Sequence, residues 1–297
     1  MSLLYSGASP DSAGLAGPLS PSTELPVARA LFCSDLDRTL IYSAAALMLD
    51  GADHDAPSLQ VAEILEGRPQ SYLTNAASGL LTQIAEAGAF VPVTTRTVAQ
   101  YRRIRFHGPR PKYAVTTNGA QILVDGVPDQ EWSDSLGHRV ANESAPLEEI
   151  SAYVLLPIHS EWMLRLRDAE GLFLYAMVER ENLPAETLTY LTAWCASRNW
   201  TVSLQGRKLY FIPSLIGKEF AVAEVARRMG GPRVVAAGDS LLDKNFLGTA
   251  FAAIRPSHGE LEESGFEAKG LTVTKKRGVL AGEEIVRAAH GMVFGDS

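Results

Sequence analysis

Two carboxylates separated by one residue stand directly after an apolar run near the start of the chain. The run covers 27–33, and Asp35 and Asp37 follow it. Such a run predicts a buried strand, and ligands of an open parallel α/β sheet bind at the carboxyl ends of its strands. Two carboxylates held this close repel each other unless a cation or a shared proton relieves the repulsion. The pair therefore predicts a metal-dependent site.

Three further element ends carry groups that suit a phosphate or a metal ion. Thr94 ends a short apolar strand with a hydroxyl group. Lys218 begins an expected helix, where a cation and the helix N-terminus can both face an anion. Asp239 and Asp243 follow another apolar strand. Each signal alone is common in turns and at helix starts. The specific feature is their order: Asp-x-Asp-x-Thr, then Thr, then Lys, then Gly-Asp-x-x-x-Asp.

The elements that must position these residues alternate between strand and helix. The expected strands and helices of the first half cover 27–33, 76–87, 90–93, 98–106 and 113–117. This rhythm is typical of a parallel sheet with crossover helices. It resumes with an expected helix over 217–229, a strand over 233–237, a helix from 243 and a strand over 250–254. We therefore expect an α/β fold with a Rossmann-like core.

The rhythm between these two parts is different and predicts an α+β insertion. Its expected elements are strands over 161–167 and 173–179, a helix over 184–198, and strands over 200–204 and 208–212. We divide the chain into core segments at 27–126 and 209–297 and an inserted domain at 127–208. Residues 1–26 are rich in Ser, Pro, Gly and Ala, which predicts a disordered tail.

Composition excludes several classes of protein. The 297 residues carry a net charge of −7, and no basic stripe is present that would neutralise the phosphates of a nucleic acid. The basic stretch at 101–107 is interpreted as a solvated helix face. No apolar run is long enough to span a bilayer, and the first 26 residues lack the basic start of a signal peptide. Cys33 and Cys195 match no zinc spacing, and isolated cysteines suit the cytoplasm.

The ordered motifs resemble those of the haloacid dehalogenase-like (HAD) superfamily of phosphohydrolases. The long insertion between Thr94 and Lys218 is similar to the type C2 cap of the Cof-like and sucrose-phosphatase-like branch of that superfamily. The turn Asn118-Gly119-Ala120 matches one that is common in the same branch. The resemblance covers the chain from about residue 27 to its end.

Two positions depart from the pattern of the branch. Thr95 stands where the branch usually has Gly in a Thr-Gly-Arg turn that here ends at Arg96, and Leu242 stands where many relatives have Asn before the acid Asp243. Neither change removes a charged group that the chemistry requires. Thr95 is expected to alter how the backbone approaches the phosphate.

The resemblance implies a role for each acid. Asp35 would attack phosphorus and form an aspartyl phosphate, and Asp37 would protonate the leaving oxygen and later activate water. Thr39 would steady the loop. Mg²⁺, which prefers oxygen ligands, would bind Asp35, the backbone carbonyl of Asp37 and Asp239, with Asp243 beside them.

The remaining motif residues would hold or support the phosphate. Thr94, Thr95 and Lys218 would bind its oxygens as charge shifts in the transition state. The supporting positions are Arg96, Asn118 and Gly119.

The inserted cap would close over the leaving group. Candidates for contact with a second anionic group or with sugar hydroxyls are Arg165, Arg167, Arg207 and Lys208, although each can also be read as an exposed strand charge. The expected partner is a small phosphorylated molecule, with a sugar phosphate as the expectation for the branch. No nucleic acid, membrane or obligate protein partner is expected.

Three alternatives to this cytoplasmic, Mg²⁺-dependent phosphatase stay open. A phosphomutase or phosphotransferase can use the same core, and the sequence separates it poorly from a hydrolase. A glycosyltransferase can bind a nucleotide sugar and a metal ion through an Asp-x-Asp pair, but it predicts no fixed role for Lys218. A non-catalytic binding module is the third alternative, and the intact motifs disfavour it.

Overall fold

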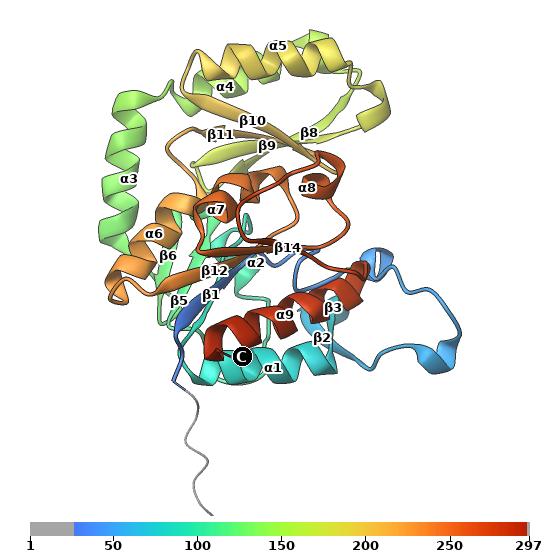
Figure 1. Ribbon diagram of the computed structural model, residues 1–297. Helices are drawn as coiled ribbons and strands as arrows, with labels where there is room; N and C mark the ends of the chain where they lie inside the picture. The colour runs from blue at the N-terminus through green and yellow to red at the C-terminus, as the bar shows by residue number, and fades with distance from the viewer. Residues whose placement is uncertain (1–26, 296–297) are drawn as a thin grey trace, which may run out of the picture.

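A five-stranded parallel sheet forms the centre of the molecule (Figure 1). The computed structural model describes residues 27–295, so the tail expected over 1–26 lies outside the described residues. Along the sheet the strand order is β14 (Leu271–Val273), β13 (Ala252–Arg255), β12 (Arg233–Ala237), β1 (Ala30–Ser34) and β4 (Phe90–Pro92). Every residue of β1 is buried, as expected for a strand covered on both faces.

Helices cover the two faces of this sheet. α1 (Asn75–Glu86) and α9 (Gly278–Phe294) lie side by side on one face, and α6 (Lys218–Arg228) and α7 (Lys244–Thr249) lie on the other (Figure 1). α1 buries Ala77, Leu81 and Ile84 at helical spacing. None of the helices in residues 27–295 combines the length and the apolar character needed to cross a bilayer.

A β-hairpin that the sequence did not predict lies between β1 and α1. Its strands are β2 (Leu59–Leu65) and β3 (Arg68–Thr74), joined by a turn at Glu66 and Gly67 in which both residues have positive φ. The 3₁₀ helices η1 (Ala44–Ala46) and η2 (Asp53–Asp55) precede it.

Three short antiparallel strands extend the sheet beyond β4. They are β5 (Tyr113–Thr116), β6 (Gln121–Val124) and β7 (Val127–Pro128), and a parallel bridge joins β5 to the end of β4. The helix expected over 98–106 is wrong beyond its first turn, because α2 ends at Tyr101. After it, Ile104 pairs with the hairpin strand β2, so tertiary pairing overrides the local pattern. The basic stretch at 101–107 is therefore not a helix face.

The inserted part is a four-stranded antiparallel sheet with helices on its outer face. The strand order is β10 (Trp200–Gln205), β11 (Lys208–Pro213), β9 (Phe173–Val178) and β8 (Met163–Ala169). The helices on the outer face are α4 (Leu147–Val154) and α5 (Ala185–Ala196), whereas α3 (Gln130–Glu143) lies to the side of this sheet and contacts β6 (Figure 1). β11 runs through Pro213, past the domain boundary expected at residue 208. The parallel core and the α+β insertion confirm the expected fold class.

The two faces of this inserted sheet differ in chemistry. Leu209 and Phe211 point into an apolar cluster that also contains Trp200. Their neighbours on β11, Lys208 and Tyr210, have the opposite orientation because side chains alternate along a strand, and both line a cavity between the insertion and the core. We call the insertion the cap.

Candidate active site

The carboxyl ends of three adjacent parallel strands bring the motif residues together. Asp35 directly follows β1, Thr94 lies two residues after the end of β4, and Asp239 lies two residues after the end of β12. Since β1 pairs with both other strands, these three positions share one edge of the sheet. The sequence analysis predicted a common site here because the carboxyl ends of parallel strands lie at one edge of the sheet, where ligands bind.

Lys218 forms the centre of the charge cluster. Its Nζ lies 2.6 Å from Asp35 Oδ1 and 2.6 Å from Asp243 Oδ1, and its side chain is 1% exposed. Burial alone would lower the pKa of Lys218, but the charges of Asp243 and Asp35 outweigh burial and raise it. The ammonium group is therefore held charged between two carboxylates.

Burial raises the pKa values of two acids at the site, Asp35 and Asp239. The pKa of Asp35 rises to about 7, first because of desolvation and then because of the nearby charge of Asp243, while Lys218 acts in the opposite direction. The pKa of Asp239 is raised well above its ordinary value, again chiefly by burial. A bound cation would favour the ionised form of both groups.

Three of these carboxylates fit a hard metal ion. Asp35, Asp239 and Asp243 each offer an oxygen atom, and these atoms lie within 4.8 Å of one another in a buried setting. Asp243 also accepts hydrogen bonds from the backbone N–H and the hydroxyl of Ser240, which fix its carboxylate. Asp239 has a looser partner, Arg38, whose Nε is 3.5 Å away. Oxygen donors of this kind match the preference of Mg²⁺.

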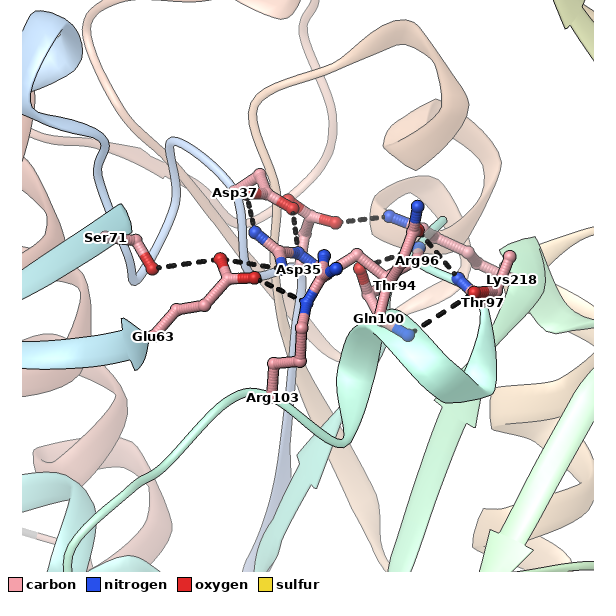
Figure 2. A network of polar contacts seen from close by, with 10 residues as sticks. All are labelled: Asp35, Asp37, Glu63, Ser71, Thr94, Arg96, Thr97, Gln100, Arg103 and Lys218. Carbon is pink, nitrogen blue, oxygen red and sulfur yellow. Dashed lines mark hydrogen bonds and ion pairs between the residues drawn. The ribbon is translucent and has the colours of Figure 1, made fainter. Parts of the chain in front are cut away.

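Asp37 points toward a different partner from Asp35. Both of its carboxylate oxygens accept hydrogen bonds from Arg96, at 2.7 Å from Nε and 2.7 Å from Nη2 (Figure 2). Its side chain is 50% exposed, whereas the Arg96 side chain is 14% exposed. Arg96 thus has a direct contact with the expected acid and base, and it also reaches Glu63, which the sequence analysis missed. The sequence does contain a signal that could have identified Glu63, because it is a charged residue within the otherwise mostly apolar strand β2.

The loop after β4 is fixed by its backbone. The Thr94 backbone N–H donates to the carbonyl of Val115, and the Thr94 hydroxyl accepts from the backbone N–H of Arg96. The Thr94 carbonyl accepts from the backbone N–H of Asn118. Thr95 lines the cavity next to Tyr210. Thr39 is buried in the loop that carries Asp35.

Gly119 explains how the helix that carries Lys218 can approach the site. It has a φ of 99°, and a Cβ atom built there would lie 2.3 Å from the carbonyl oxygen of Gly217. Gly217 is the N-cap of α6, and Lys218 is its first residue. The turn that contains Asn118 and Gly119 therefore permits close contact with the start of α6.

A cavity of about 410 Å³ lies between the charge cluster and the cap. Asp35, Asp37 and Asp239 line it from the core, and Arg207 and Lys208 line it from the cap. The sequence analysis missed five further cap residues in its lining, Met177, Arg180, Gln205, Gly206 and Tyr210. Burial lowers the pKa of Lys208, although the charge of Asp37 opposes this effect.

The other two candidates for substrate contact, both arginines, have a different environment. Arg165 and Arg167 are exposed on β8 and are not among the residues that line this cavity. They pair across the sheet with Met177 and Tyr175. Of the four expected cap contacts, the structure thus brings Arg207 and Lys208 to the site and leaves Arg165 and Arg167 outside it.

One carboxylate of the core contacts both the cap and the loop of the metal-site acids. Glu260 Oε1 accepts a hydrogen bond of 3.2 Å from the backbone N–H of Gly206, at the turn between β10 and β11. Its Oε2 accepts one of 3.2 Å from the backbone N–H of Leu241, between Asp239 and Asp243.

Comparison with known proteins gives no family model that matches the chain. Among curated proteins, the chain is 29% identical over 115 residues to Protein LST4 of Eremothecium gossypii, a match that covers 38% of this chain. The chain spans 15% of the length of that relative.

Solved structures give a broader likeness. The sucrose-phosphatase of Synechocystis, in complex with sucrose and phosphate, has a TM-score of 0.60 and 16% identity over 88% of this chain and 97% of that one. A protein of Thermoplasma acidophilum has a TM-score of 0.54 and 12% identity over 87% and 97% of the two chains. The HAD subclass IIB sugar phosphatase BT4131 has a TM-score of 0.51 and 11% identity over 89% of this chain and 100% of that one. At these identities the likeness concerns the fold, and the chain has the fold of the haloacid dehalogenase-like phosphatases, as the motif order predicted.

Proposed function

We propose that the chain is a Mg²⁺-dependent phosphatase of small phosphomonoesters that acts through an aspartyl phosphate. The observation that carries the proposal is Lys218, which is held charged between Asp243 and Asp35, and Asp35 lines the cavity. A buried cation beside a potential nucleophile suits a phosphoryl group, whose oxygens need positive charge as the bond to the leaving group breaks.

Asp35 is the proposed nucleophile. Its Oδ1 accepts from Lys218, and within residues 27–295 its Oδ2 has no hydrogen-bond partner, which leaves this oxygen for attack on phosphorus. The P–O bond to the leaving group breaks while the carboxylate–phosphorus bond forms. Thr94, Thr95 and Lys218 are proposed to bind the phosphoryl oxygens.

Asp37 is the proposed acid and base. In the first step it gives its proton to the departing oxygen, and in the second it takes a proton from the water that attacks the aspartyl phosphate and releases inorganic phosphate. Asp35, Asp239, Asp243 and the Asp37 carbonyl are the proposed magnesium ligands. When bound, the ion supplies charge neutralisation between the carboxylates and the phosphate.

A sugar phosphate is the proposed substrate class. The cap side of the cavity presents hydrogen-bonding groups on Gln205, Arg207, Lys208 and Tyr210, and such groups suit the hydroxyls of a sugar. Two of the similar structures are named as a sucrose-phosphatase and a sugar phosphatase. A glycosyltransferase is disfavoured because the Asp37 carboxylate pairs with Arg96 and is not one of the three carboxylates that could hold a metal ion together.

Release of phosphate from a panel of sugar phosphates, nucleotides and p-nitrophenyl phosphate tests the proposal. We expect release that requires Mg²⁺ and is abolished in Asp35→Asn. Wild-type release that survives complete removal of metal would contradict the scheme. Transfer of phosphate to a second sugar without release would assign a phosphotransferase or phosphomutase instead.

A further inference from the structure

Glu63 is a buried carboxylate that lies between two arginine side chains. Its side chain is 4% exposed, with Oε2 3.0 Å from Nη1 of Arg96 and Oε1 2.9 Å from Nε of Arg103 (Figure 2). Together with Asp37, these residues form a line of alternating charges, Asp37–Arg96–Glu63–Arg103. One end of the line is the proposed acid and base, and the other end lies away from the cavity.

Strand pairing holds the Glu63 backbone from two sides. Glu63 pairs with Ser71 of β3 at an irregularity in the register, and with Ile104 on its other side. The neighbouring carbonyl of Ala62 accepts from the backbone N–H of Arg105 at 2.7 Å. The position of the carboxylate is therefore set by strand pairing and not by a flexible loop.

A buried carboxylate is costly without compensation, so its presence here needs an explanation. Arg96 offers one. Its guanidinium uses Nε and Nη2 for Asp37 and Nη1 for Glu63. Because the guanidinium is planar and rigid, fixing one of its edges also fixes the direction of the other.

The position of the Asp37 carboxylate depends more on the orientation of the Arg96 guanidinium than on packing against neighbouring side chains. Half of its side chain is exposed, and both of its oxygens bind the same edge of Arg96. We propose that Glu63 is a positioning residue, which orients Arg96 so that Arg96 holds Asp37 at the place where the leaving group departs. This inference rests on the proposed phosphatase function.

The chemistry of the leaving group separates this role from a purely structural one. An alkyl oxygen, as in a sugar phosphate, needs a proton as it leaves, whereas p-nitrophenolate leaves without one. The parameter kcat/KM reports the steps up to departure of the leaving group. A misplaced Asp37 therefore lowers kcat/KM for the alkyl substrate more than for p-nitrophenyl phosphate, while partial unfolding lowers both equally.

The experiment measures the ratio of the two kcat/KM values, alkyl over aryl, in wild type, Glu63→Gln and Asp37→Asn with Mg²⁺ present. General acid catalysis contributes about 10²–10⁴-fold, so we expect the ratio to fall about tenfold or more in Glu63→Gln and furthest in Asp37→Asn. The matched control is Glu149→Gln, which removes an exposed ion pair with Arg198 in the cap and is expected to leave the ratio unchanged.

Two further variants keep the inference open to refutation if Glu63→Gln folds poorly. Glu63→Asp retains the charge but shortens the reach, and Arg96→Lys retains the charge but removes the planar fork; both are expected to lower the ratio. The inference would be overturned, and the proposed function left intact, if Asp37→Asn lowers the ratio but Glu63→Gln does not. The same conclusion would follow if Asp37→Asn lowers the ratio but Glu63→Asp and Arg96→Lys do not. No metal-dependent release by wild type from either substrate would overturn both.

Discussion

Replacing Gly119 by alanine is expected to weaken both the fold and the proposed site. The nearest atoms to a Cβ built at this position belong to backbone, at 2.3 Å for the Gly217 carbonyl oxygen and 3.1 Å for the Lys218 nitrogen. Backbone atoms cannot rotate aside as the end of a flexible side chain can. The start of α6 must therefore move, and Lys218 moves with it.

The size of the effect follows from two costs. A φ of 99° is strained for a residue with a Cβ atom, which costs about 1–3 kcal/mol. Overpacking of a close contact typically costs about 1–3 kcal/mol. Together they lower the free energy of unfolding by roughly 2–6 kcal/mol, out of a total of about 5–15 kcal/mol for a typical protein. A displacement of Lys218 by about 1 Å is expected to reduce turnover by about 10²-fold.

Urea denaturation followed by circular dichroism measures the first effect, and phosphate release measures the second. Gly79→Ala is the matched control, because Gly79 lies inside α1 with no atom within 4 Å of its built Cβ; this change is expected to stabilise the protein by up to about 1 kcal/mol. If Gly119→Ala unfolds at the same urea concentration as wild type, the argument from the close contact with Gly217 is wrong.

Three further predictions concern the charge cluster, the metal ion and the cap. Lys218→Met removes the cation between two buried carboxylates, so we expect loss of turnover and a free energy of unfolding at neutral pH that is lower by about 3–5 kcal/mol. If urea denaturation gives the same free energy of unfolding for Lys218→Met as for wild type, this prediction is wrong. Because the metal-free pKa of Asp35 is about 7, a proton occupies this carboxylate below that pH and must leave when the ion binds. Affinity for Mg²⁺ is therefore expected to rise between about pH 6 and about pH 8, and equal affinities in calorimetry would contradict it. Trp200→Ala empties a buried position whose indole N–H donates to the Ala145 carbonyl, and a loss of about 3–5 kcal/mol in urea denaturation is expected.

Four of the five core strands were predictable because they are short, mainly apolar runs that end at polar residues, whereas the partly exposed β14 was missed. β12 has the bounds expected from the sequence, and α6 differs from the expected helix only at its two capping residues, Gly217 and Met229. Such runs are buried on both faces, so no competing pattern obscures them.

Three of the missed features have weak local patterns for physical reasons, whereas α9 (Gly278–Phe294) was missed despite its buried apolar face. In α3 only Leu136 is buried, so the helix lacks the apolar stripe that identifies amphipathic helices. In β2 an irregular register and the buried charge of Glu63 break the alternation of a surface strand. The end of α2 depends on pairing between Ile104 and the hairpin, which no local pattern contains.

The candidate site also has a part that the sequence predicts and a part that it does not. The positions of Asp35, Thr94 and Asp239 follow from the rule that parallel strands share one carboxyl edge. The pairing of Arg96 with Asp37 and Glu63 joins three segments that are distant in sequence. The register of the cap strands decides that Lys208 faces the cavity, and one residue of slip would reverse it.

The two hydrogen bonds of Glu260 make the cap and the 239–243 loop thermodynamically linked. One carboxylate accepts from Gly206 of the cap and from Leu241 of the loop, so ordering either segment fixes the acceptor that the other needs. Linkage is reciprocal: a ligand that orders the loop favours the docked cap by the same free energy with which the docked cap favours that ligand. Ligand binding at the 239–243 loop and docking of the cap are therefore coupled through Glu260.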